Sequence, residues 1–147
     1  FDGPPPEVNL FNEKNNGIAV QKLISNKLVN SVHDISDGGL IITIAEMIIS
    51  SNIGAKITLQ NNLTNSNGDP EMLYEKMFGE DQSRYVITVS LDKVNDVIDQ
   101  CTKSNVSANI IGDIQKNDLE IDGLVTISNN ELIDSYESVL PDMMNIK

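Results

Sequence analysis

Residues 32–49 read VHDISDGGLIITIAEMII, and they place carboxylates and a pair of glycines directly before an apolar run. The apolar run predicts a buried helix that begins near Gly39. The start of a helix presents unpaired backbone N–H groups and the positive end of the helix dipole, so it favours anions. Glycines also let a ligand approach the backbone where a Cβ would block it. The stretch therefore predicts a strand-to-helix turn, which either binds a phosphate or is an ordinary turn.

A second polar stretch follows at residues 77–85, which read MFGEDQSRY. Neighbouring acids such as Glu80 and Asp81 repel each other unless a cation or solvent separates them, and carboxylate oxygens suit Mg²⁺. The hydroxyl of Ser83 can donate to a phosphate or an amide, while the guanidinium of Arg84 pairs with an acid or an anion. This stretch therefore predicts metal and substrate contacts, with a solvated acidic loop as the alternative.

Together the two stretches resemble the C-terminal part of the phosphoribosylformylglycinamidine synthase family, the small bacterial type of synthase subunit, in a superfamily that includes aminoimidazole ribonucleotide synthetase. The resemblance lies in HDxSDGGL followed by AEM, and in FGEDQSR. It extends to the lead-in at residues 3–10 and the closing segment 132–143, so it covers essentially the whole chain. It implies an α+β fold, a layered α/β sandwich with a mixed sheet, like the C-terminal domain of aminoimidazole ribonucleotide synthetase.

The resemblance also implies a reaction of de novo purine biosynthesis. In this family ATP activates the formyl amide oxygen of formylglycinamide ribonucleotide, and glutamine-derived ammonia then displaces phosphate to give the amidine. The implied cofactors are ATP and Mg²⁺. The implied partners are the preceding domains of the same subunit, a glutaminase subunit and a small accessory subunit. Because the family's histidine and lysine for this chemistry belong to preceding domains, we expect no catalytic residue here and no activity from the chain alone.

The resemblance implies roles for individual positions. The implied nucleotide-binding residues are Asp34, Gly38, Gly39, Gly79 and Glu80. The implied metal ligands are Glu80 and Asp81, and the implied substrate contacts are Ser83 and Arg84. Structural roles compete with these assignments, namely a turn or helix cap at Asp34, Ser36 and Asp37, and a helix C-cap at Gly79.

The single histidine and the single cysteine limit the possible chemistry. Because His33 is the only histidine and Cys101 the only cysteine, this chain has neither a histidine-cluster metal site nor a plausible Cys–His pair. A structural hydrogen bond at a strand end is the favoured role of His33, with a proton carrier as the alternative. Cys101 continues the helical spacing of Val94, Val97 and Ile98, which predicts a small buried hydrophobe. A lone cysteine also fits a reducing cytoplasm.

The formal charge of −12 comes without a basic patch, which disfavours nucleic acid and anionic membranes as partners. No apolar run reaches the roughly 18 residues of a membrane span, and the first residues show neither the basic flank nor the apolar stretch of a signal peptide. We therefore expect a cytoplasmic protein that binds neither nucleic acid nor membranes. An acidic protein still binds nucleotides where Mg²⁺ bridges its carboxylates to the phosphates.

We expect residues 1–8, with three consecutive prolines, to form an extended linker, and residues 9–147 to form a single domain. The start at Phe1 suggests a fragment of a larger subunit. The expected helices are 9–28, 39–51, 70–78, 93–104 and a last one, capped by Ser128 to Glu131 and ended by Pro141. The expected strands are 31–35, 55–59, 85–89, 106–114, 119–121 and 124–127, with a loop at 60–69 and a stop at Gly54.

Two other functions are compatible with these patterns. The first is a domain of another superfamily member, such as a selenophosphate synthetase, a thiamine-phosphate kinase or a hydrogenase-maturation protein. The complete FGEDQSR string argues against it. The second is a non-catalytic acidic interaction domain that kept the fold and lost the ligands.

Overall fold

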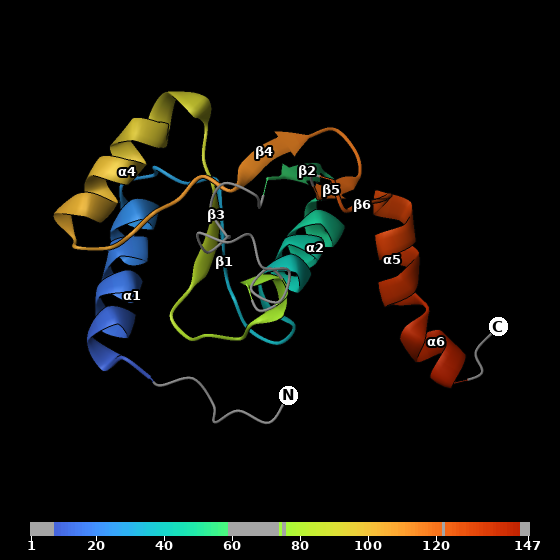
Figure 1. Cartoon of the computed structure of the whole chain (residues 1–147). Coiled ribbons are helices and arrows are strands. Elements are labelled where there is room, and N and C mark those ends of the chain that lie inside the picture. The colour runs from blue at the N-terminus through green and yellow to red at the C-terminus, as the bar shows by residue number, and fades with distance from the viewer. Residues whose placement is uncertain (1–7, 59–73, 75, 122, 145–147) are drawn as a thin grey trace. The chain divides into compact units, whose positions relative to one another are not determined.

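The structure is a computed structural model that describes residues 8–58, 74, 76–121 and 123–144. The chain forms two compact units, the first from Phe1–Thr43 and Met77–Asn109, the second from Ile44–Lys76 and Ile110–Lys147. Helix α2 (Gly39–Ser51) begins in the first unit and continues in the second. The elements follow one another along the chain as Figure 1 shows.

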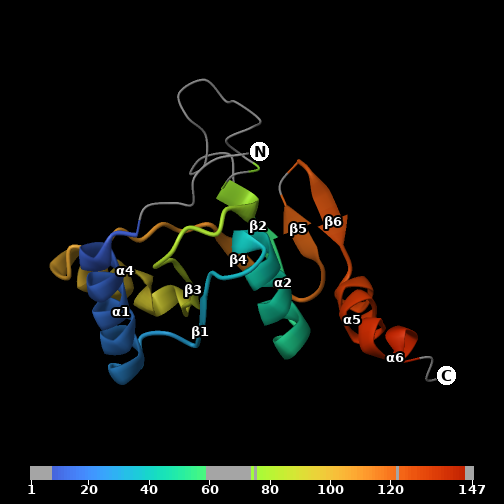
Figure 2. The same cartoon turned by 90° about the horizontal axis from the view of Figure 1, so that it is seen from below.

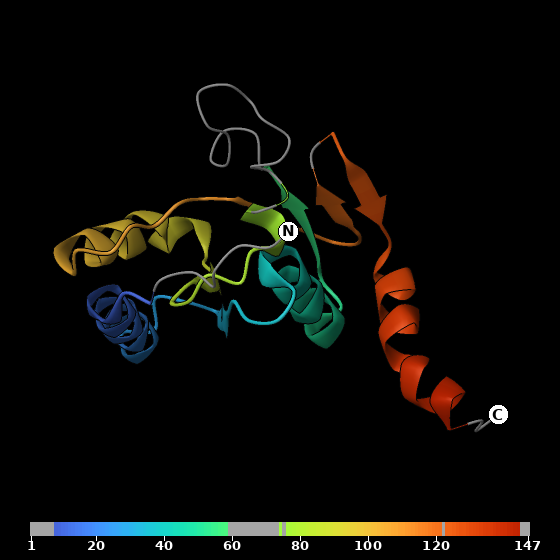
Figure 3. The same ribbon diagram turned by 60° about the horizontal axis from the view of Figure 1, so that its bottom comes forward.

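In the first unit, helices α1 (Leu10–Ser25) and α4 (Val94–Lys103) lie side by side (Figures 1 and 3). Strands β1 (Ser31–Asp34) and β3 (Tyr85–Thr88) form an antiparallel pair, and a short 3₁₀ turn, η1 (Leu91–Lys93), leads into α4. The core of this unit contains Leu23, Val97 and Cys101, with Leu28, Val29, Ile87, Val89 and Val106 packed against it. Cys101 thus has the buried position that its helical spacing predicted.

The ends of α1 follow from local chemistry. The Asn9 side chain caps the helix, because its Oδ1 accepts the N–H groups of Phe11 and Asn12 at 3.1 Å each. The helix was expected to reach about residue 28 but ends at Ser25. Lys27 adopts a left-handed conformation (φ 56°) and the Leu28 N–H returns to the Leu23 carbonyl at 3.0 Å, the hydrogen bond that closes a Schellman motif.

The second unit contains the predicted mixed sheet. Its strand order is β4 (Gly112–Gln115), β2 (Gly54–Ile57), β5 (Leu119–Ile121) and β6 (Val125–Ile127). The pair β2–β5 is parallel and the other two pairs are antiparallel. Helix α2 lies against this sheet (Figures 1 and 2). The buried apolar residues of this unit include Ile44, Ala45, Ile48, Ala55, Ile57, Leu119 and Ile121.

Two further expectations about element boundaries are wrong. The strand expected over 106–114 begins only at Gly112. Gly54 does not stop the preceding helix but opens β2, where an added Cβ would collide with the backbone of Asn117 and Asp118. The helix already ends at Ser51, and the next residue, Asn52, is left-handed (φ 54°).

Pro141 does not end the last helix. The helix is broken at Ser138 into α5 (Asn129–Glu137) and α6 (Val139–Met143), and Pro141 lies inside α6. It is the third residue of α6, where a backbone N–H has no partner within the helix, so its missing donor costs no hydrogen bond. The start of α5 follows the prediction, because Ser128 Oγ accepts the Glu131 N–H at 3.2 Å.

Several expectations fall outside the described residues. They are the linker except for Val8, the loop 60–69 and about half of the helix 70–78, of which residues 74 and 76–78 are described and helical. Within the described part of the chain, no helix combines the length and the apolar character that crossing a bilayer requires.

Candidate functional site

Strand pairing brings the two polar stretches together in the first unit. In the β1–β3 pair Asp34 lies opposite Tyr85 and His33 lies opposite Val86. The first stretch leaves the pair at Asp34, and the second enters it at Tyr85. The loops that follow Asp34 and precede Tyr85 therefore start from the same end of the pair.

A side chain of the second loop caps the helix that follows the first loop. Glu80 Oε1 accepts a hydrogen bond from the Gly38 N–H at 2.8 Å, across 42 positions of sequence. A carboxylate at a helix start satisfies a free donor and faces the positive end of the helix dipole. Ser36 or Asp37 was the expected cap, and this bond from Glu80 is a contact that local sequence did not indicate.

The glycine pair has a packing role at the same place. Gly38 and Gly39 adopt left-handed conformations, with φ values of 81° and 73°. A Cβ added to Gly39 would lie 2.6 Å from the carbonyl carbon of Phe78 and 2.9 Å from the Gly79 oxygen. The close approach that Gly39 permits is therefore made by this chain's own backbone. The nucleotide-binding roles of Gly38, Gly39 and Gly79 stay predictions.

The Arg84 side chain binds two other residues of its own loop, Gly79 and Asp81. Its Nη2 donates to the Gly79 carbonyl, its Nε donates to the Asp81 carbonyl at 3.4 Å, and Nη2 lies 3.6 Å from Asp81 Oδ2. Asp81 is thus paired with Arg84, whereas Glu80 contacts Gly38. The joint metal role of Glu80 and Asp81 and the substrate contact of Arg84 stay predictions.

Asn16 of helix α1 holds Ser83. Its amide Nδ2 donates to the Ser83 carbonyl at 2.8 Å and to the Ser83 hydroxyl at 3.0 Å. Ser83 is left-handed, with a φ of 69°, which is uncommon for a residue other than glycine. Sequence analysis did not identify Asn16, because nothing local links a helix residue to a loop 67 positions away.

His33 and the backbone of Asp34 form a small structural group. His33 Nδ1 donates to the Asp34 carbonyl at 2.7 Å, since a carbonyl oxygen only accepts, and lies 3.7 Å from Asp34 Oδ1. Thr43 Oγ1 donates to the same carbonyl at 3.5 Å. These contacts favour the structural role of His33. The Asp34 carboxylate, with 69% of the side chain exposed, is turned toward solvent and available to a ligand.

A cleft of about 400 Å³ lies in the first unit where these loops meet α1. Four predicted site residues line it: Asp34, Glu80, Ser83 and Arg84. The cleft is completed by Glu13, Ile35, Ser36, Asp37, Gln82 and Tyr85. Sequence analysis did not identify Glu13 either, which lies three residues before Asn16 and so on the same face of helix α1.

The cleft is acidic. Four carboxylates (Glu13, Asp34, Asp37 and Glu80) and one guanidinium (Arg84) give −4 and +1, a formal charge of −3. A phosphate alone would be repelled, whereas a divalent cation would neutralise both sides. Among the residues that the structure describes, no group of three or more His, Cys, Asp or Glu side chains is placed to hold a metal. The donor set fits Mg²⁺, which typically takes one or two carboxylates and completes its shell with phosphate and water.

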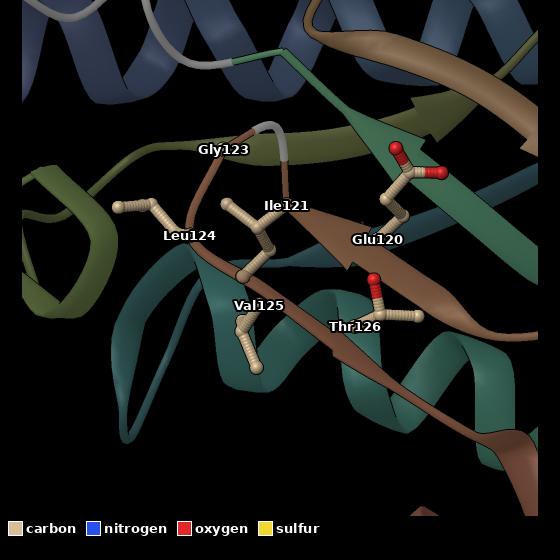
Figure 4. Close-up of a pocket in the computed structure, with 6 residues that line it drawn as sticks. All are labelled: Glu120, Ile121, Gly123, Leu124, Val125 and Thr126. Carbon is tan, nitrogen blue, oxygen red and sulfur yellow. The ribbon is translucent and has the colours of Figure 1, made fainter.

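A second hollow, of about 280 Å³, lies along the β5–β6 hairpin in the second unit (Figure 4). Three of its six lining residues are aliphatic (Ile121, Leu124 and Val125), and the carboxylate of a fourth, Glu120, is bound by Lys56 Nζ at 2.6 Å. None of the predicted site residues lines it, so the acidic cleft is the better candidate.

A family model identifies the class of protein to which this α+β chain with its mixed sheet belongs. The model described as AIR synthase related protein, C-terminal domain, matches residues 1–122. The chain belongs to this family.

Relatives of known name are similar over nearly the whole chain. The phosphoribosylformylglycinamidine synthase subunit PurL of Pelagibacter ubique is 38% identical over 143 residues, which is 97% of this chain and 19% of that protein. The PurL subunit of Allorhizobium ampelinum is 40% identical over 146 residues, 99% of this chain and 19% of that protein. The chain thus spans about a fifth of the length of these relatives.

Solved structures agree on the fold. Thermotoga maritima PurL complexed with FGAR has a TM-score of 0.72 at 18% identity, over 86% of this chain and 21% of that chain. The PurLQS structure from the same organism has a TM-score of 0.76 at 19% identity, over 87% of this chain and 22% of that chain. A thiamine-monophosphate kinase from Stenotrophomonas maltophilia has a TM-score of 0.59 at 18% identity, over 71% and 34%. The fold is therefore common to synthases and a kinase.

Proposed function

We propose that this chain is the C-terminal domain of an ATP-dependent ligase of de novo purine biosynthesis. The ligase converts formylglycinamide ribonucleotide, ATP and glutamine-derived ammonia to formylglycinamidine ribonucleotide. The observation that carries the proposal is the shared cleft: Asp34 from the first stretch and Glu80, Ser83 and Arg84 from the second line one cavity. The name of the relatives at 38% and 40% identity supports the same reaction.

The chemistry of the lining supports a division of roles in the cleft. The exposed carboxylate of Asp34 and that of Glu80 are the candidate contacts to a Mg²⁺–nucleotide, and Mg²⁺ would supply charge neutralisation for the phosphates. Gly38, Gly39 and Gly79 are the candidate backbone contacts to the nucleotide, and Asp81 is the second candidate metal ligand, although these four residues are not among those that line the cleft. Ser83 and Arg84, which do line it, are the candidate contacts to the substrate. The similar structures of Thermotoga maritima PurL complexed with ATP and with ADP support a nucleotide.

We infer that residues 9–147 act as one domain behind a linker at 1–8, within a longer subunit of the cytoplasm. The length of the relatives supports the longer subunit, because the chain matches only 19% of that length. The similar chain in the PurLQS structure of Thermotoga maritima supports a glutaminase and a small accessory subunit as partners. Since the chain's own candidate residues are carboxylates, a serine and one arginine, we expect no amidine formation from the 147-residue chain alone.

A kinase of the thiamine-phosphate type is the alternative to test, because the Stenotrophomonas enzyme shares the fold at 18% identity. One experiment separates the two. The longer subunit that contains this chain is incubated with Mg-ATP and ammonium, together with either formylglycinamide ribonucleotide or thiamine monophosphate. We expect ATP-dependent amidine with the first and no phosphorylation of the second. Turnover of thiamine monophosphate would reverse the choice, and failure to bind any of these ligands would favour a non-catalytic interaction domain.

A further inference from the structure

The contact between Asn16 and Ser83 fixes the direction of every hydrogen bond in it. The same Asn16 atom lies 2.8 Å from the Ser83 carbonyl oxygen and 3.0 Å from the Ser83 hydroxyl oxygen. A carbonyl oxygen can only accept, so the atom that faces it is the amide nitrogen, which settles the orientation of the Asn16 amide. The second hydrogen of that nitrogen is then directed at the hydroxyl.

An amide NH₂ group has no capacity to accept. The Ser83 oxygen must therefore accept from Asn16, and the hydroxyl hydrogen has to point elsewhere. Ser83 lines the acidic cleft, and within the described part of the chain no residue accepts a hydrogen bond from its hydroxyl. Asn16 thus leaves Ser83 with one free donor at the cleft.

Asn16 also holds the backbone of Ser83. A left-handed conformation at a residue with a side chain persists only where the surroundings hold it. At Ser83 (φ 69°) the amide of Asn16 binds the carbonyl and the hydroxyl of the same residue. Asn16 on helix α1 therefore determines both where the Ser83 hydroxyl lies and that its hydrogen is free to be donated.

We propose that Asn16 is a positioning residue that makes Ser83 a hydrogen-bond donor to the ligand. This end of the cleft then takes an acceptor oxygen of the ribonucleotide substrate, from its phosphate or its amide carbonyl, and disfavours an N–H group. The ionised carboxylates of the lining can only accept hydrogen bonds and so select donor groups of a ligand. The Ser83 hydroxyl donates a hydrogen bond and so selects an acceptor. The inference rests on the proposed function, because it takes formylglycinamide ribonucleotide as the ligand.

The test uses the longer subunit with Asn16→Asp, Ser83→Ala and the double variant. In Asn16→Asp a carboxylate replaces the donor, so the Ser83 hydroxyl turns to it and is lost to the ligand. We expect the Kd of formylglycinamide ribonucleotide, measured by calorimetry, to rise about ten-fold or more in each single variant. The double variant should bind about as weakly as Ser83→Ala, because the two residues act through one hydroxyl. KM should follow Kd while kcat stays near the wild-type value.

Asn15→Asp is the matched control, because it makes the same change in charge on the same helix one residue away. It should change Kd by less than about two-fold, as expected of a surface substitution. Asn16→Ala removes the donor without adding a charge, and it too should weaken binding if the variant melts like the wild type. Wild-type affinity in folded Asn16→Ala or Asn16→Asp would overturn the inference, as would losses that add fully in the double variant. A wild-type subunit that neither binds this ribonucleotide nor forms amidine contradicts the proposed function instead.

Discussion

The Glu80 carboxylate accepts the Gly38 N–H at 2.8 Å, and this bond joins the two polar stretches on which the candidate site depends. It gives Glu80 a structural task at the start of α2 in addition to its place in the cleft lining. The two tasks need different properties of the side chain. Capping requires an acceptor oxygen, whereas binding a cation requires the negative charge as well.

Two substitutions of Glu80 separate these tasks. Glu80→Gln keeps an acceptor oxygen, so we expect the free energy of unfolding to change by less than about 0.5 kcal/mol. Glu80→Ala removes the cap and should cost about 0.5–2 kcal/mol. In the longer subunit both variants should lose Mg²⁺-dependent nucleotide use. Denaturant unfolding measures the stability of the variants, and ATP titrations measure their nucleotide use. Glu137→Ala, which removes an exposed acid, is the control. If the Gln and Ala variants of Glu80 were equally stable, Glu80 would not act as a helix cap.

Gly39→Ala should be strongly destabilising. The new Cβ would lie 2.6 Å from the Phe78 backbone, and alanine is strained at a φ of 73°. We expect a loss of about 2 kcal/mol or more. Gly17→Ala is the opposite control, because its Cβ would meet nothing closer than the Tyr85 hydroxyl at 4.0 Å within a helix. That variant should gain up to about 1 kcal/mol, and a mild effect at Gly39 would contradict the close packing described for it.

Local patterns predicted the elements well because their causes are local. The apolar run from Leu40 formed α2, helix α1 begins where the predicted helix 9–28 begins, and Ser128 caps α5 as the sequence predicted. Boundaries failed where a single backbone conformation decides, as at Lys27, or where the position of a proline within a turn matters, as at Pro141.

The site itself was predictable only in part. Asp34, Glu80, Ser83 and Arg84 line one cleft, whereas the binding roles that the resemblance implied for them stay predictions. The partners that position them were not visible in sequence, because the bonds from Asn16 to Ser83 and from Gly38 to Glu80 join residues 67 and 42 positions apart. Such pairs depend on how strands β1 and β3 align, and the spacing of apolar residues along the sequence does not predict this alignment.

Cys101 should react slowly with thiol reagents in the folded chain. It is 5% exposed in the core beside Leu23 and Val97, and burial raises the pKa of its thiol, so the reactive thiolate is scarce. The neutral thiol contributes fully to stability below the unfolded pKa of about 8.5, and this contribution is lost as the pH rises through the folded value. Ellman's reagent at a pH of about 8, just below that unfolded pKa, should label the native chain far more slowly than the chain in guanidinium. Equal rates would show that Cys101 is open to solvent.

Asp34→Asn tests the carboxylate of the first stretch. The contacts from His33 and Thr43 reach the backbone carbonyl of Asp34, while its side chain is 69% exposed, so the amide should leave the free energy of unfolding within about 0.5 kcal/mol. In the longer subunit the same change removes the charge that a Mg²⁺–nucleotide needs, and we expect the KM for Mg-ATP to rise by about ten-fold or more, the size of a hydrogen bond or ion contact to a charged group. The exposed acid Asp92 on η1 supplies the control, since Asp92→Asn makes the same change outside the cleft and should leave KM unaltered. If Asp34→Asn instead lowers the melting temperature while Mg-ATP binds the folded fraction normally, Asp34 is an acid of the turn alone, and the nucleotide contact has to come from the other carboxylates of the cleft.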